Sequence, residues 1–186
     1  MRYEEKQIVL KNGLECILRN TGPEDAEATL FHLRQTSGET DYISRYPEEV
    51  TLTVEEEEAF LEKVLTDSKS LMIAAVVDGK IVANAAFNCV LDTFKYRHRA
   101  DLGIAVQQEY WDQGIGTAML AELIKEAEKV GYEQLELEVD CRNEKAVKLY
   151  QKLGFRTYGT RERTFKLKDG SYSSFYLMLL PLNAAR

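Results

Sequence analysis

The stretch that most constrains the fold of this chain is Asp101–Gly116. Its first part, Leu102–Val106, is an apolar run that predicts a β-strand. A polar segment with glycines at positions 114 and 116 follows at once. An amphipathic α-helix is predicted directly after it, because apolar residues recur at helical spacing. These residues are Ile115, Met119, Leu123 and Ile124.

A strand that runs through a glycine turn into a helix is a plausible place for a phosphate group. The first amides of a helix have no partner within the helix, and the helix dipole is positive at this end. The common nucleotide motifs do not fit, since Met119 occupies the third glycine position of the dinucleotide fingerprint and no Gly-Lys-Ser/Thr sequence is present. A turn that only packs a helix onto a sheet is the alternative.

Composition limits the functions open to the chain. Its 186 residues, 45% of them hydrophobic, are enough for one core, so a single domain over residues 1–186 is predicted. The net charge of −7 argues against a nucleic-acid binder, and it favours a cationic partner such as an amine.

The three cysteines are Cys16, Cys89 and Cys141. Their odd number and wide spacing predict reduced thiols, with no metal site and no disulfide framework. The chain lacks an apolar leader at its start and any apolar run of the roughly 20 residues that span a bilayer. A cytoplasmic protein without a membrane partner is therefore expected.

The remaining elements are predicted from periodicity and turn chemistry. The helices are expected from Gly22-Pro23 to about Gly38, from Thr53 to Thr66 and from Asn143 to Gly154, besides the helix that begins at 115. The strands are expected at 14–19, 71–77, 81–87, 135–140, 155–167 and 172–180, besides 102–106. Helices that interrupt strands in this way indicate an α/β or α+β fold with a mixed sheet.

A second group of residues lies on the helix that begins after the strand 135–140. Asn143, Ala146, Val147 and Tyr150 are spaced by three, four and seven residues, so they share one face. If the strands that end near Val106 and Asp140 are neighbours, both helix starts lie at the carboxyl ends of the strands, where ligands bind in open α/β sheets. Each residue also has an ordinary structural role, Asn143 as a helix cap and Tyr150 as a packing aromatic.

The chain resembles the GNAT superfamily of acyl-coenzyme A dependent N-acetyltransferases in two motifs. Val106-x-x-Glu-Tyr-x-x-x-Gly114-x-Gly116 is similar to the pyrophosphate-binding motif of that family. Asn143-x-x-Ala-x-x-x-Tyr150-x-x-x-Gly154-Phe155 is similar to its second motif. Trp111 departs from the family pattern, which usually carries arginine or glutamine there. The motif acts mainly through backbone amides, so cofactor binding is expected to persist.

The resemblance implies the GNAT fold, a mixed and mostly antiparallel sheet of about seven strands with about four helices. It also implies acetyl-CoA as cosubstrate, with Ala105 and Val106 pairing with the pantetheine arm and the thioester. Asn143 and Tyr150 would contact the cofactor as well. The pyrophosphate would bind the amides of Trp111, Asp112, Gln113, Gly114, Ile115, Gly116 and Thr117.

In the implied reaction a neutral primary amine attacks the thioester directly, in a ternary complex. Tyr150 would protonate the departing thiolate. Asp101 is the candidate base, either directly or through water. Alternate residues of a strand lie on the same face, so Asp101 shares its face with Gly103 and Ala105. Cys141 is not expected to be a nucleophile, since both histidines lie far away in the sequence. Cys141 is expected to be a buried thiol, and the histidines to be surface or packing residues.

The acceptor is expected to be a small-molecule amine, with a protein N-terminus or a lysine as the alternative. A non-catalytic acyl-CoA binding module would keep the glycine turn and Asn143 but would need no proton donor at Tyr150. A structural dimer is the third alternative, because the apolar segment Tyr176–Leu180 could pair across a two-fold axis. A homodimer is also compatible with the enzyme.

Overall fold

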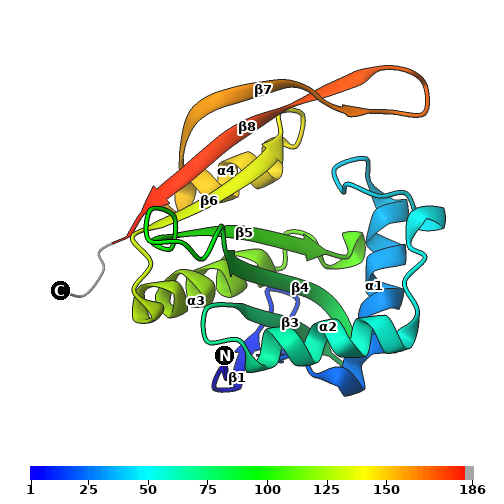
Figure 1. The fold of residues 1–186 in the computed structure, drawn as a ribbon. Coiled ribbons are helices and arrows are strands. Elements are labelled where there is room, and N and C mark those ends of the chain that lie inside the picture. The colour runs from blue at the N-terminus through cyan, green and yellow to red at the C-terminus, as the bar shows by residue number, and fades with distance from the viewer. Residues whose placement is uncertain (183–186) are drawn as a thin grey trace. The chain divides into compact units, whose positions relative to one another are not determined.

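The computed structural model describes residues 1–182 and is shown in Figure 1. The chain divides into two compact units. The first comprises Met1–Asn88 with Gly103–Leu123, and the second comprises Cys89–Leu102 with the residues from Ile124 onward. Strand β5 (Arg99–Val106) and helix α3 (Ile115–Val130) contribute residues to both units. The predicted single domain over 1–186 stays a prediction.

The first unit contains an antiparallel run of strands and two helices. The strands pair in the order β1-β2-β3-β4. They are β1 (Lys6–Val9), β2 (Glu15–Asn20), β3 (Leu71–Val77) and β4 (Lys80–Cys89). The helices are α1 (Ala26–Glu39) and α2 (Val54–Thr66), with short 3-10 turns at Pro23–Asp25 and Pro47–Glu49.

Local polar contacts define the start of α2 and of the 3-10 turn that precedes α1. Before α1, the buried Asp25 accepts a hydrogen bond from the Gly22 amide at 3.0 Å and forms a bidentate ion pair with Arg19. Before α2, the Thr53 hydroxyl accepts from the Glu56 amide at 3.2 Å, and the Glu56 carboxylate accepts from the Thr53 amide at 2.9 Å. The second arrangement is a capping box at Thr53, where the sequence predicts the start of this helix.

In the second unit β5 pairs with β6 (Gln134–Asp140) in parallel, with Asp101 opposite Glu136. The two strands are therefore neighbours over residues 99–101 and 134–136, as the sequence-based hypothesis requires. Strand β8 (Tyr172–Pro181) is antiparallel both to β6 and to β7 (Arg156–Lys166). Strands β7 and β8 form the long hairpin coloured orange and red in Figure 1. Helix α4 (Glu144–Lys152) lies between β6 and β7 in the sequence.

The fold class is confirmed, with eight strands among residues 1–182 in place of about seven. The additional strand is β1, which forms a hairpin with β2 around the Asn12-Gly13 turn. Val9 is 70% exposed, and no residue of this strand is fully buried. The strand therefore lacks the apolar alternation by which a half-buried strand is detected.

The proposed strand pairing of Tyr176–Leu180 across a two-fold axis is wrong. Residues Tyr176 to Leu179 are paired with β6 on one edge and with β7 on the other. A strand with both edges bonded has no free backbone groups for a partner. A homodimer by another surface stays a prediction.

Both arms of the β3–β4 hairpin are largely buried, as their apolar composition predicts. Phe87, Leu18 and Ile73 are fully buried in the first unit, and Tyr132 and Leu135 are in the second. Among the helices of residues 1–182, none has the length and apolarity needed to cross a bilayer. The cytoplasmic location stays a prediction.

Candidate functional site

The first part of the candidate site is the turn between β5 and α3. A 3-10 turn, Gln108–Tyr110, follows β5, and α3 begins at Ile115 as predicted. Gly114 has φ of +98°, and the residue two before it, Asp112, has φ of +63°. Both lie in the left-handed region, which glycine adopts freely and aspartate tolerates. The sharp change of direction therefore depends on these two positions.

The backbone of this turn offers a binding site for an anion. The amide of Ala118 donates to the Gly114 carbonyl at 3.1 Å. The amides of Ile115, Gly116 and Thr117 come before this hydrogen bond, in the first turn, where helix amides have no partner within the helix. A Cβ atom added to Gly114 would meet no atom within 4 Å, so the space beside the turn is open. Helix α3 is 16 residues long, and its dipole favours negative charge beside the amides at its amino-terminal end. The arrangement fits a phosphate-bearing ligand.

The indole of Trp111 gives the turn an internal brace. Its Nε1 donates a hydrogen bond to the carbonyl oxygen of Val106 at 2.8 Å. This contact ties the middle of the turn to the last residue of β5. The amide of Lys11 also donates to the Gln113 carbonyl at 3.2 Å, from the β1–β2 hairpin. Sequence reasoning assigned the Trp111 amide to the pyrophosphate and noted the departure from the family pattern, but it missed this structural role of the side chain.

The second part of the candidate site is the start of α4. The carboxamide oxygen of Asn143 accepts from the Ala146 amide at 3.2 Å, which confirms Asn143 as the helix cap. Because the carboxamide oxygen accepts the cap hydrogen bond, only the NH₂ group of Asn143 could donate to a ligand. This group donates no hydrogen bond within residues 1–182. Contact with a cofactor stays a prediction.

Tyr150 lies two turns further along α4. It is only 6% exposed, and its ring packs edge-on against Phe155 with the ring centroids 5.8 Å apart. Burial raises the pKa of the Tyr150 phenol to about 12. The hydroxyl group is therefore protonated at neutral pH. A protonated phenol can donate a proton but cannot act as a base.

Asp101 lies near the start of β5 with an exposed side chain. Its pKa is raised, first because neighbouring protein atoms remove the carboxyl group partly from water and second because the Glu136 carboxylate is near. Glu136 itself is held by Arg99, whose Nη2 donates to its Oε2 at 2.7 Å. A raised pKa brings a carboxylate closer to the range in which it can accept a proton.

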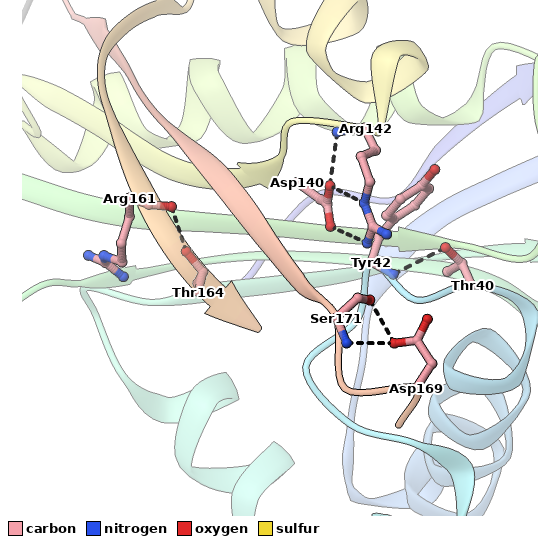
Figure 2. Close-up of polar contacts among 8 residues, drawn as sticks. All are labelled: Thr40, Tyr42, Asp140, Arg142, Arg161, Thr164, Asp169 and Ser171. Atoms are coloured by element: carbon pink, nitrogen blue, oxygen red, sulfur yellow. Dashed lines mark hydrogen bonds and ion pairs between the residues drawn. The ribbon is translucent and has the colours of Figure 1, made fainter. Parts of the chain in front are cut away.

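An ion pair directly before α4 was missed by sequence reasoning. Asp140, which is 1% exposed, accepts hydrogen bonds from the backbone amide of Arg142 at 2.9 Å and from its guanidinium group at 2.7 and 3.0 Å (Figure 2). Burial alone would raise the pKa of Asp140, but these bonds outweigh it and the pKa is lowered. Arg142 is thus fixed next to Asn143. The Asp-x-Arg spacing before the cap is the signal that could have indicated it.

The cysteines are free thiols in the structure. Cys141 is half-buried rather than buried as expected, because it follows the last residue of β6. Partial burial and the charge of Asp140 raise the pKa of Cys141. It is therefore a thiol at neutral pH and a poor nucleophile, in agreement with the sequence-based interpretation.

The predicted site residues thus form two groups. Ala105, Val106 and the residues Trp111 to Thr117 lie in one strand–turn–helix segment. Asn143 and Tyr150 lie at the start and on the body of one helix. That the two groups meet in one site stays a prediction, as does the role of Asp101.

Comparison with known proteins agrees with the motifs. The family model described as acetyltransferase (GNAT) family matches residues 31–155. The ribosomal protein bS18-alanine N-acetyltransferase of Escherichia coli (strain K12) is 37% identical over 106 residues, which are 57% of this chain and 68% of that protein. The L-amino acid N-acetyltransferase AaaT of the same strain is 30% identical over 107 residues, which are 57% of this chain and 65% of that protein.

A solved structure extends the similarity over nearly the whole chain. The acetyltransferase of GNAT family from Streptococcus pneumoniae is 32% identical and superposes with a TM-score of 0.85. The match covers 90% of this chain and 99% of that chain. The family model covers well over half of the present sequence, including both motifs. We conclude that the chain belongs to the acetyltransferase (GNAT) family and is an acetyl-transferring enzyme of it.

Proposed function

We propose that the protein transfers an acetyl group from acetyl-CoA to the primary amine of a small molecule. The observation that carries this proposal is the turn between β5 and α3. Its left-handed residues Asp112 and Gly114 place the amides of Ile115, Gly116 and Thr117 at the start of a long helix. These amides would hold the pyrophosphate of acetyl-CoA, and the backbone of Ala105 and Val106 would hold the pantetheine arm. Acetyl-CoA would supply the activated acyl group as a thioester.

The proton transfers are assigned to two side chains. Tyr150 would donate its proton to the sulfur of the leaving group, since burial keeps its phenol protonated. A free alkyl amine, with a pKa of about 10.4 for a lysine-like group, must lose a proton before or during attack. Asp101 would accept that proton, directly or through water, because alternate residues of β5 place it on the same face as Ala105.

The family membership favours an enzyme over a non-catalytic binding module and over a structural dimer. It leaves the acceptor open between two classes. The similarity to the L-amino acid N-acetyltransferase supports a small molecule that carries an amino group. The similarity to the bS18-alanine N-acetyltransferase supports a second candidate, the N-terminal amine of a protein.

The proposal is tested by mass spectrometry of acceptors incubated with the protein and acetyl-CoA. One set contains free L-amino acids and simple alkyl amines, and the other contains short peptides that begin with alanine. Acetylation of the first set at a higher kcat/KM than the second supports the proposal. Preferential acetylation of the peptides would establish the second candidate. Acetylation of neither set, in protein that binds acetyl-CoA, would overturn both acceptor classes.

A further inference from the structure

Gln107, the residue directly after β5, is buried and held from several sides. It is 6% exposed, and its backbone amide donates to the Val82 carbonyl at 2.9 Å. Its side-chain Nε2 donates to the Ile81 carbonyl at 3.1 Å and lies 3.3 Å from Nδ1 of His32. A residue at this place determines where β5 ends and where the turn begins.

His32 is the partner of Gln107 on helix α1. It is completely buried, and burial lowers the pKa of His32 to about 4, so the ring is neutral at physiological pH. The carboxamide nitrogen of Gln107 can only donate, and therefore Nδ1 of His32 accepts and Nε2 carries the proton. Nε2 makes no hydrogen bond of good geometry among residues 1–182, but the backbone of Ala105 and the side chain of Asn84 lie near enough to the ring to oppose part of the pKa shift. Buried polar groups are nearly always hydrogen-bonded, so a buried imidazole with an incomplete set of hydrogen bonds calls for an explanation.

A second contact joins the same helix to the next residue of the turn. Glu39 lies seven residues after His32, two helical turns along the same face. Its Oε2 accepts from the Gln108 backbone amide at 2.8 Å, and its Oε1 accepts from Gln35 Nε2 at 2.9 Å. Gln35 therefore fixes the carboxylate that holds Gln108.

The two contacts reach the 3-10 turn that follows. The carbonyls of Gln107 and Gln108 accept from the amides of Tyr110, at 2.9 Å, and Trp111, at 3.1 Å. Trp111 in turn braces Val106. A displacement of Gln107 or Gln108 is therefore passed to the backbone that leads into the phosphate-binding amides.

We propose that His32 and Glu39 are positioning residues, which hold the end of β5 and the following turn in the geometry that acetyl-CoA requires. This inference rests on the proposed function. The His32–Gln107 contact sets the backbone of Ala105 and Val106, and the Glu39–Gln108 contact sets the 3-10 turn. Helix α1 thereby acts on the cofactor segment through Gln107 and Gln108. Small displacements matter, because a misplacement of about 1 Å can reduce a rate by roughly a hundredfold.

A purely structural role for His32 makes a different prediction. If the ring only fills space, a substitution lowers the stability of the whole fold, and the turn is affected no more than any other buried segment. If the ring positions Gln107, the turn becomes locally mobile while the rest of the fold stays protected. Hydrogen exchange of backbone amides separates the two cases, because it reports opening of individual segments.

The test compares three variants with the wild type. His32→Leu keeps the approximate volume and removes the acceptor. His32→Asn keeps an acceptor oxygen close to the position of Nδ1. Leu30→Val is the control, since Leu30 is 2% exposed on the same helix and about 200° around it from His32. For each protein, amide exchange over residues 105–117 is measured without ligand, and the Kd of acetyl-CoA is measured by calorimetry.

We expect His32→Leu to increase exchange over residues 105–117 selectively and to raise the Kd of acetyl-CoA about three- to tenfold, the effect of one lost hydrogen bond. His32→Asn should restore both towards wild type, and Leu30→Val should change neither. Glu39→Gln, which retains an acceptor but loses its charge, should raise the Kd less than Glu39→Leu does. Equal exchange and equal Kd in His32→Leu and Leu30→Val would overturn the inference. Failure of the wild type to bind acetyl-CoA would instead contradict the proposed function, and the exchange data on the free protein would still decide whether His32 positions the turn.

Discussion

The indole nitrogen of Trp111 donates a hydrogen bond to the carbonyl oxygen of Val106, and the two atoms are 2.8 Å apart. The contact closes the turn on the strand that precedes it. One consequence is that one of the two lone pairs on the Val106 carbonyl oxygen already accepts a hydrogen bond within the protein. A ligand that pairs with the end of β5 would therefore use the remaining backbone groups of Ala105 and Val106, since a carbonyl oxygen has two lone pairs.

Trp111→Phe keeps an aromatic ring and removes the donor. We expect a loss of about 0.5–1.5 kcal/mol in the free energy of unfolding, the usual contribution of one hydrogen bond. The Kd of acetyl-CoA should rise a few-fold because the turn is less constrained. Urea unfolding and calorimetry measure the two effects. An unchanged Kd would show that the indole contributes to stability only.

Gly114→Ala tests the backbone geometry of the turn. With φ of +98° and no atom within 4 Å of the added Cβ, any effect arises from backbone strain rather than from a clash. Strain of about 1–2 kcal/mol is expected. Gly131→Ala is the matched control, because Gly131 has φ of +92° and open space at the other end of α3. Both variants should lose stability, but only Gly114→Ala should weaken acetyl-CoA binding. Equal binding by the two would contradict the assignment of the turn.

Tyr150→Phe removes the proposed proton donor and keeps the ring that packs on Phe155. Turnover should fall by roughly 10²–10⁴, the range for general acid–base catalysis, and the Kd of acetyl-CoA should stay nearly the same. Tyr158→Phe, at a tyrosine that is 52% exposed on β7, is the control and should keep full turnover. Wild-type turnover in Tyr150→Phe would remove Tyr150 from the mechanism.

His32 should make stability depend on pH. Its pKa falls from the ordinary value of 6.5 to about 4 in the fold, so the unfolded chain binds more protons between these values. The contribution of His32 to the free energy of unfolding is therefore fully present above pH 6.5. It decreases as the pH falls towards 4, by about 1.4 kcal/mol per pH unit. The slope should be shallower in His32→Leu, as urea unfolding at several pH values would show. The same slope in both proteins would indicate that the fold does not lower the pKa of His32.

Much of the fold could be predicted because its elements carry local signals. The Thr53–Glu56 capping box and the turn glycines Gly79, Gly131 and Gly154, all at positive φ, mark element ends close to where they occur. Strand β1 gave no signal, since it is held by pairing with β2 rather than by burial of its own side chains. Long-range pairing of this kind leaves no periodic pattern in the sequence.

The candidate site was predictable where backbone geometry defines it and not where distant side chains support it. Gly114 and Asn143 are recognisable from turn and cap chemistry. The contact between His32 and Gln107 joins residues 75 positions apart, and it could not be found without the fold. The paired edges of β8 were missed for the same reason, because an apolar strand looks alike at the edge and in the middle of a sheet.

The central claim, that the turn after β5 holds acetyl-CoA, is tested most directly by thermal unfolding with acetyl-CoA, coenzyme A, ATP and NAD. At about a hundred times its Kd a ligand adds roughly 2.7 kcal/mol, and a chain of this size gains about 2–4 °C per kcal/mol. We predict an increase in Tm of about 5–10 °C with acetyl-CoA and with coenzyme A, and a smaller one or none with ATP and NAD. A folded protein whose Tm is unchanged by either coenzyme A species at such concentrations would contradict the claim and leave the glycine turn as a packing feature.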